Sequence, residues 1–269
     1  LFLILTRHIF KKYSVKKREL YVFLNFLIAI INISIYFGTN RTDVLVTTIV
    51  SYLLMYKLYG KKIIKYLIIG VIVLIVLISI ITIGREYVSI SGGSNRLLDI
   101  TDTFQVYTGG PYNVAIAIET KEYFPEANDI SVLFFDIFRP MIGINVLVKD
   151  LPFQYSNVFF NKRIWLNIDR RSQILPMIGQ GYLFFGFIFA PIFSIIFIKL
   201  YYYFEKKSDE TYNIEVFYFL NLVIVRLGFF MGQNTMNIIN DMSMNLILFL
   251  VVYYLNKFFK QIIYKSIVI

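Results

Sequence analysis

The chain has 269 residues, of which 58% are hydrophobic and 18% aromatic, while only 16% are charged and the formal net charge is +10. Soluble domains carry about 25% charged and about 45–50% apolar residues. This composition therefore excludes an ordinary soluble globule and a disordered chain. The sequence contains no cysteine, which excludes a disulfide-stabilised scaffold and any thiol-based catalytic or metal chemistry.

Six apolar stretches approach the length of about 20 residues that a membrane-spanning helix needs. In chain order they are 20–37, 44–56 with an extension to Tyr59, 66–83, 181–198, 216–231 and 242–256. Residues 1–6 are also apolar and run into a basic stretch, which is typical of the end of a further helix. The sequence therefore predicts an all-α integral membrane protein with about six transmembrane helices.

Three segments follow from these stretches. Residues 1–83 contain the helix stump, a basic loop and three transmembrane helices. Residues 84–180 form one large loop. Residues 181–269 contain three further transmembrane helices and a basic tail.

The basic residues predict which way the chain faces. Together with Arg7, the loops 8–19, 57–65, 199–215 and 257–269 hold 16 of the 27 Lys and Arg residues, whereas the loop 232–241 holds none. The positive-inside rule places the basic loops in the cytoplasm and the loop 84–180 outside. That outer loop has nine basic and ten acidic residues. The net charge of +10 is thus mostly a topology signal, and we expect no nucleic-acid partner.

Two segments of the outer loop, 104–118 and 130–148, are apolar enough to raise the question of further crossings. If 130–148 crossed alone, the basic loops at 199–215 and 257–269 would face outward. If both crossed as a pair, the acidic segment 119–129 would be cytoplasmic, against the charge rule. We therefore expect two interfacial or re-entrant helices at the outer surface.

Lysine and arginine are divided between the two sides. Of the 16 predicted cytoplasmic basic residues 14 are Lys, whereas seven of the ten predicted outer ones are Arg. A planar guanidinium fork suits phosphate and carboxylate groups, so the outer arginines predict a polyanion-binding pocket. The alternative is that they form ordinary salt bridges with the outer acids. The seven are Arg41, Arg85, Arg96, Arg139, Arg163, Arg170 and Arg171.

Arg226 interrupts the predicted crossing 216–231. At 1.5 Å per residue it lies roughly 18–20 Å above the cytoplasmic end of its helix. An arginine at that depth is a functional-site hypothesis by default. The alternative is that its side chain extends to the outer interface.

The segment 160–186 supplies further candidates. Arg163 and Arg170 would share a helix face if the segment were helical, and Trp165 between them suits either the membrane interface or stacking on a sugar. The single histidine, His8, is on the predicted cytoplasmic side. We therefore expect no metal and no Ser-His-Asp catalysis outside. The candidate outer bases are Glu86, Asp99, Asp102, Glu119 and Asp136.

Three short stretches, at 39–45, 108–119 and 173–191, add to the pattern of a multi-span protein with an arginine-rich outer loop. Together they resemble the Wzy-type polysaccharide polymerases, which share a GT-C-like architecture with related ligases. TNRTDVL at 39–45 is similar to the small-residue–Arg–Thr segment of this family, and TGGPYNVAIAIE at 108–119 to an outer-loop segment of its capsular members. QILPMIGQGYLFFGFIFAP at 173–191 resembles the Gly–aromatic–Gly re-entry into a helix. The resemblance would cover most of the chain, as the C-terminal portion of such a polymerase.

The resemblance implies a function. Family members join undecaprenyl pyrophosphate-linked repeat units into O-antigen, capsule or exopolysaccharide at the outer face of the bacterial cytoplasmic membrane, without a metal or cofactor. The implied partners are the lipid-linked glycan, the bilayer, and a chain-length regulator and flippase of the same pathway. The related ligases use an outer histidine, which this chain lacks.

The expected site residues follow from the resemblance and from the need for fixed cations near a pyrophosphate leaving group. We expect catalytic roles for Arg85, Arg139, Arg163, Arg170, Asp102 and Glu119. We expect binding of pyrophosphate or sugar by Arg41, Arg171, Arg226, Tyr112, Trp165 and Gln180. The competing hypotheses are a transporter or flippase of lipid-linked sugar, and a structural subunit of an envelope complex.

Overall fold

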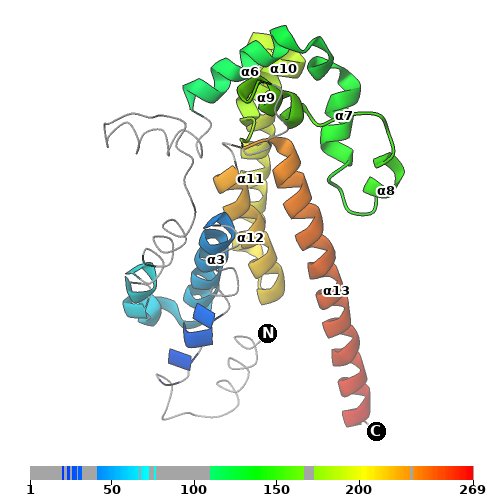
Figure 1. Ribbon diagram of the computed structural model, residues 1–269. Helices are drawn as coiled ribbons and strands as arrows, with labels where there is room; N and C mark the ends of the chain where they lie inside the picture. Colours follow the sequence, from blue (N-terminus) through cyan, green and yellow to red (C-terminus); the bar gives the residue numbers. More distant parts are fainter. Residues whose placement is uncertain are drawn as a thin grey trace. The chain divides into compact units, whose positions relative to one another are not determined.

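The computed structural model describes eight residues between 20 and 31, then 41–66, 68–72, 76, 110–166, 173–230 and 233–268. Every element in these ranges is a helix (Figure 1). The all-α class is therefore confirmed for the described part of the chain. The predictions for 1–6 and 104–109, and most of those for 66–83, lie outside these ranges.

The chain divides into two compact units. The first comprises Leu1–Val88 and Phe204–Val225, and the second Ser89–Tyr203 and Arg226–Ile269. The helices α11 (Ile192–Glu210) and α12 (Ile214–Phe230) each run from one unit into the other.

The first unit is organised around α3 (Arg41–Tyr59), which continues into the short 3-10 helix η1 (Gly60–Ile63). Val46 and Val50 of α3 are buried against Leu222 of α12. A fully buried aliphatic side chain of this size stabilises a fold by about 1.5–3 kcal/mol. The buried Asn221 donates from Nδ2 to the Ser208 hydroxyl at 2.7 Å, so its amide group is satisfied inside the unit.

The second unit contains a cluster of short helices. In chain order they are α6 (Pro111–Tyr123), η2 (Pro125–Asn128), α7 (Ile130–Phe138), α8 (Asn145–Val148), α9 (Ser156–Ile164) and α10 (Met177–Phe189). Proline occupies the first position of α6, where its missing N–H costs nothing. Asp129 caps α7 by accepting from the Ser131 N–H at 2.9 Å.

The core of this cluster lies where α6 packs against α9 and α10. Ile116 and Ala117 of α6 meet Phe160 of α9 and Leu183 of α10 there. Two asparagines of α9 hold the segment that leads into α10: the Asn161 side chain bonds to both N–H and C=O of Gln173, and Asn157 Oδ1 accepts from the Leu175 N–H. The position of α10 is thus set by amide groups as well as by apolar contact.

The predicted crossing 181–198 is not one straight helix. Its residues are divided between α10 and α11, whose axes differ by 106°. Gly186 has φ +75°, a backbone conformation that side chains other than glycine rarely adopt. A Cβ at Gly181 would lie 2.0 Å from the Ala190 carbonyl oxygen, so the chain returns close to itself at this bend.

The outer-loop segment 130–148 is also broken. It forms α7 with nine residues, a turn, and α8 with four residues. At 1.5 Å per residue, α7 is about 14 Å long, well short of a bilayer core of about 30 Å. The described part of 104–118 belongs to α6, which has 13 residues and is also too short to cross.

The last helix, α13 (Thr235–Val268), is the clearest membrane candidate. Its portion Thr235–Phe258 has 24 residues and a mean hydropathy of 1.7, with only 6% of the apolar window buried. A helix that is apolar all round and uncovered by protein suits a lipid environment. Among the described residues, one helix is long and apolar enough to cross, or two if the α10–α11 pair counts as one broken span. The prediction of six crossings is therefore not confirmed.

Candidate functional site

The expected site residues fall into two groups. Arg85, Asp102, Arg170 and Arg171 lie outside the described residues, and only the backbone of Arg41, at the start of α3, is described. Arg139 ends α7, Arg163 lies in the last turn of α9, and Arg226 lies near the end of α12. Tyr112, Glu119, Trp165 and Gln180 are also described.

Arg163 is held by two residues of α6. Its Nη2 lies 2.6 Å from Glu119 Oε2, and its guanidinium carbon lies 4.3 Å from the centre of the Tyr123 ring. The side chain of Arg163 is 24% exposed and that of Glu119 is 47% exposed. The Arg163 Nε is buried without a hydrogen-bond partner among the described residues.

This arrangement, which we call the Arg163 clamp (Arg163, Glu119 and Tyr123), results from the packing of α6 against α9. A guanidinium stacked on an aromatic ring loses rotational freedom and keeps its fork in one plane. The exposed Glu119 carboxylate occupies part of that fork. A phosphate oxygen could exchange with it, because both anions suit the same planar donors. The alternative expectation, that an outer arginine forms a salt bridge with an outer acid, is thus also met at Arg163.

The helix that contains Arg163 ends immediately after it. α9 ends at Ile164, and Leu166 has φ +51°. The condition for Arg163 and Arg170 to share one helix face, a continuous helix over both, is therefore not met in the described part of this segment, and Arg170 itself lies outside the described residues. Trp165 is the C-cap residue of α9, so the aromatic ring is carried by the turn and not by a continuous helix.

Arg226 forms an ion pair with Asp241 of α13. The Arg226 side chain is 10% exposed and that of Asp241 is 29% exposed. Removing either partner of a largely buried pair takes away part of the compensation of the other partner's charge. Arg226 therefore binds a protein carboxylate in this structure. Asp241 follows Arg226 by 15 residues, a separation at which no helical spacing rule predicts a contact.

Gln180 belongs to a buried polar chain that sequence reasoning missed. Its Nε2 donates to Asp136 Oδ2 at 2.7 Å, and its Oε1 accepts from the Thr235 N–H at 2.9 Å. Asp136 also accepts from the backbone N–H and the hydroxyl of Ser156. We call these four residues the Asp136 chain. It joins α7, α9, α10 and the first turn of α13.

Burial dominates the electrostatics of the Asp136 chain. It raises the pKa of the Asp136 carboxyl from 3.8 to about 6, against the opposing effect of the Ser156 and Gln180 hydrogen bonds. Gln180 and Asp136 are 0% and 1% exposed, respectively. Gln180, expected to bind substrate, therefore uses its amide inside the protein. Asp136, which was among the possible bases, caps the N-terminus of α9.

Two further predicted residues lie elsewhere in the second unit. Tyr112 is exposed near the start of α6. Burial raises the pKa of the Tyr155 phenol, and the nearby cation of Arg139, which follows α7, opposes part of that rise. No group of three or more His, Cys, Asp or Glu side chains that could hold a metal is found in the part of the chain that the structure describes.

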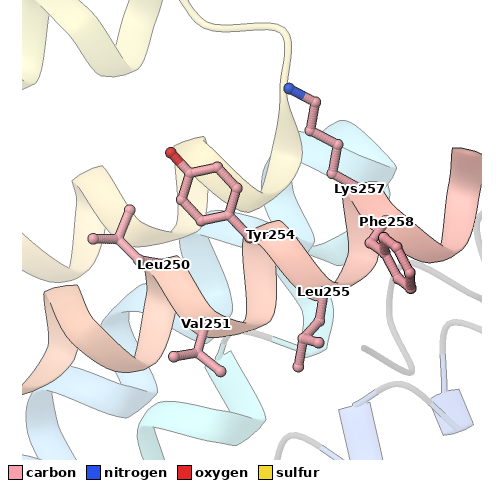
Figure 2. Close-up of a pocket in the computed structure, with 6 residues that line it drawn as sticks. All are labelled: Leu250, Val251, Tyr254, Leu255, Lys257 and Phe258. Carbon is pink, nitrogen blue, oxygen red and sulfur yellow. The ribbon is translucent and has the colours of Figure 1, made fainter.

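An open depression of about 750 Å³ lies along α13 (Figure 2). All six residues that line it belong to this one helix: Leu250, Val251, Tyr254, Leu255, Lys257 and Phe258. Its lining is mostly aliphatic and aromatic, and it includes none of the expected site residues. It is better explained as exposed apolar helix surface than as a binding site for a polar substrate.

Comparison with known proteins adds no assignment. No protein-family model matches the chain, and neither a curated protein nor a solved structure is similar enough to count as a match.

Proposed function

We propose that this chain is a membrane-embedded, metal-independent glycosyltransferase. It polymerises undecaprenyl pyrophosphate-linked oligosaccharide repeat units into O-antigen, capsular or exopolysaccharide at the outer face of the bacterial cytoplasmic membrane. The observation that carries the proposal is the Arg163 clamp, a partly exposed guanidinium fixed on Tyr123 and next to an exposed carboxylate. The exposed apolar surface of α13 supports the membrane location.

The chemistry needs both members of the ion pair. The bond between the donor sugar and the pyrophosphate oxygen breaks, and the same carbon bonds to a hydroxyl oxygen of the acceptor. The pyrophosphate leaves with the electron pair, and a guanidinium fixed in advance stabilises the charge that develops on it. Glu119, released from Arg163 by the incoming phosphate, accepts the hydroxyl proton.

A reconstitution experiment tests this function. The purified chain is placed in liposomes with lipid-pyrophosphate repeat units, and the glycan products are separated by length. We expect lengthening without ATP or a metal. We expect Arg163→Lys to lower the rate about 10²-fold, because lysine keeps the charge and loses the fork.

Lys207→Arg is the matched control, since Lys207 is half-exposed and pairs with Glu210 one turn away on α11. It should keep the wild-type rate. If Arg163→Lys gave product ladders of unchanged length and yield, the clamp would have no part in catalysis.

A transporter or flippase of lipid-linked oligosaccharide is the second candidate. The 106° bend between α10 and α11 favours it, because broken helices often form the binding sites of transporters. In the same liposomes, movement of the lipid-linked substrate across the bilayer without glycan lengthening would support this candidate and contradict the polymerase.

A further inference from the structure

The chain between α7 and α9 projects from the second unit as an apolar loop. From Met141 to Tyr155 no residue is buried, and α8, in the middle of this stretch, has no buried residue either. Leu147 is 81% exposed and Val146 is 63% exposed. Loops on a water-facing surface are normally polar, so this segment, which we call the α8 loop (residues 141–155), needs another explanation.

Both ends of the α8 loop are attached to the rest of the unit. At its start, the Ser243 hydroxyl of α13 accepts from the Ile142 N–H at 3.4 Å and lies 3.3 Å from the Pro140 carbonyl oxygen, while the Asn240 carbonyl oxygen of its own helix is at 3.0 Å. At its end, the Ser156 N–H donates a hydrogen bond to the buried carboxylate of Asp136. The apolar tip is therefore presented by two anchored ends.

The first anchor lies where the exposed apolar stretch of α13 begins. Ser243 is followed by Met244, and exposed apolar side chains continue along the helix to Phe258. The loop therefore leaves the unit beside the residue at which the exposed apolar stretch of the candidate membrane span begins. A long apolar helix lies either in the core of a large protein or in a membrane, and only 6% of the apolar window of α13 is buried in this structure.

We propose that the α8 loop inserts into the outer leaflet of the bilayer beside α13. Val146 and Leu147 lie among the acyl chains, and Lys149 and Asp150 remain at the headgroup level. The inference rests on the membrane location in the proposed function and does not depend on the polymerase chemistry. Of the two interfacial segments expected in the outer loop, the proposal assigns the lipid contact to the one that contains α8. The described part of the other segment belongs to α6, which packs against α9 and α10.

Because the chain has no cysteine, a single cysteine can be labelled at each chosen position with an environment-sensitive fluorophore. We compare Leu147→Cys with Glu126→Cys, which lies on the exposed surface of η2, and with Val251→Cys on α13. The full chain is reconstituted in vesicles of equal parts phosphatidylcholine and phosphatidylglycerol. Doxyl-labelled lipids then report contact with the acyl chains.

We expect the probe at 147 to emit at shorter wavelength than the probe at 126 and to be quenched by lipids that carry the doxyl group near the headgroup. If the probe at 147 emitted at the wavelength expected in water while the probe at 251 was quenched by doxyl lipids, the proposal that the loop inserts into the bilayer would be wrong. The membrane location of the chain would still hold. A blue-shifted probe at 147 that doxyl lipids do not quench would indicate a protein contact and would also overturn it. Loss of glycan lengthening with both probes quenched would contradict only the polymerase.

Discussion

At Arg163, two expectations from the sequence meet in one side chain. The guanidinium stacks on Tyr123 and pairs with Glu119, so a salt bridge and a fixed cation are present at once. The pair is partly solvated, and such pairs contribute little to stability, in general about 0–1 kcal/mol. The Arg163–Glu119 pair would therefore matter because it orients the guanidinium fork of Arg163. Arg163→Lys tests this, because lysine keeps the charge and lacks the fork.

Asp136 leads to a prediction about pH. Because burial raises its pKa from 3.8 to about 6, the folded protein binds a proton at this carboxyl more tightly than the unfolded chain does. The contribution of Asp136 to the free energy of unfolding is largest below about pH 4 and is lost as the pH rises through about 6, by up to about 3 kcal/mol. Asp136→Asn should remove this pH dependence.

Chemical unfolding of the protein in detergent micelles, followed from acid to neutral pH, measures the effect. The matched control is Asp150→Asn, because Asp150 is exposed in the α8 loop. Asp150→Asn should leave the dependence of the free energy of unfolding on pH unchanged. An unchanged slope in Asp136→Asn would mean that this carboxyl has an ordinary pKa.

Among the elements, α12 and α13 are linked by the Arg226–Asp241 pair. Loss of one partner leaves a charge in a poorly solvated position, so we expect Arg226→Ala and Asp241→Ala each to lower the free energy of unfolding by about 2–4 kcal/mol. The double substitution should cost less than the sum of the two, with a coupling of about 1–3 kcal/mol.

The control pair is Lys207 and Glu210, which is half-exposed on α11. Its coupling should be below about 1 kcal/mol, as is usual for surface pairs. Additive effects at Arg226 and Asp241 would show that the ion pair does not join the two helices energetically.

For the whole molecule, the distribution of Lys and Arg predicts the side of the membrane on which each loop lies. Single cysteines at Tyr212, between α11 and α12, and at Glu126, in η2, test it. A membrane-impermeant thiol reagent added to intact cells should label position 126 and leave position 212 unlabelled until the cells are opened. Labelling of position 212 in intact cells would reverse the predicted orientation.

The sequence by itself determined the helical class, the apolar stretches and the residues from which a polyanion site could be built. Hydropathy and charge belong to individual residues and to short windows, so they can be evaluated without knowing any contact. Such local properties show the apolar stretch 242–256 and the enrichment of arginine in the segment 84–180. They do not show the ends of α13, which extends beyond that stretch on both sides, from Thr235 to Val268.

Only the tertiary structure decided where helices end and which polar groups meet. A kink at Gly186 inside α10 and the bend between α10 and α11 divide a stretch whose composition is mostly apolar. Composition cannot predict the close approach of Gly181 to Ala190 there, because it is a contact within the folded chain. Asp136, Gln180 and Thr235 are separated by 44 and 55 residues along the chain, yet they share hydrogen bonds in the core. Burial makes such pairing necessary, since a polar group removed from water must find a partner wherever the fold provides one.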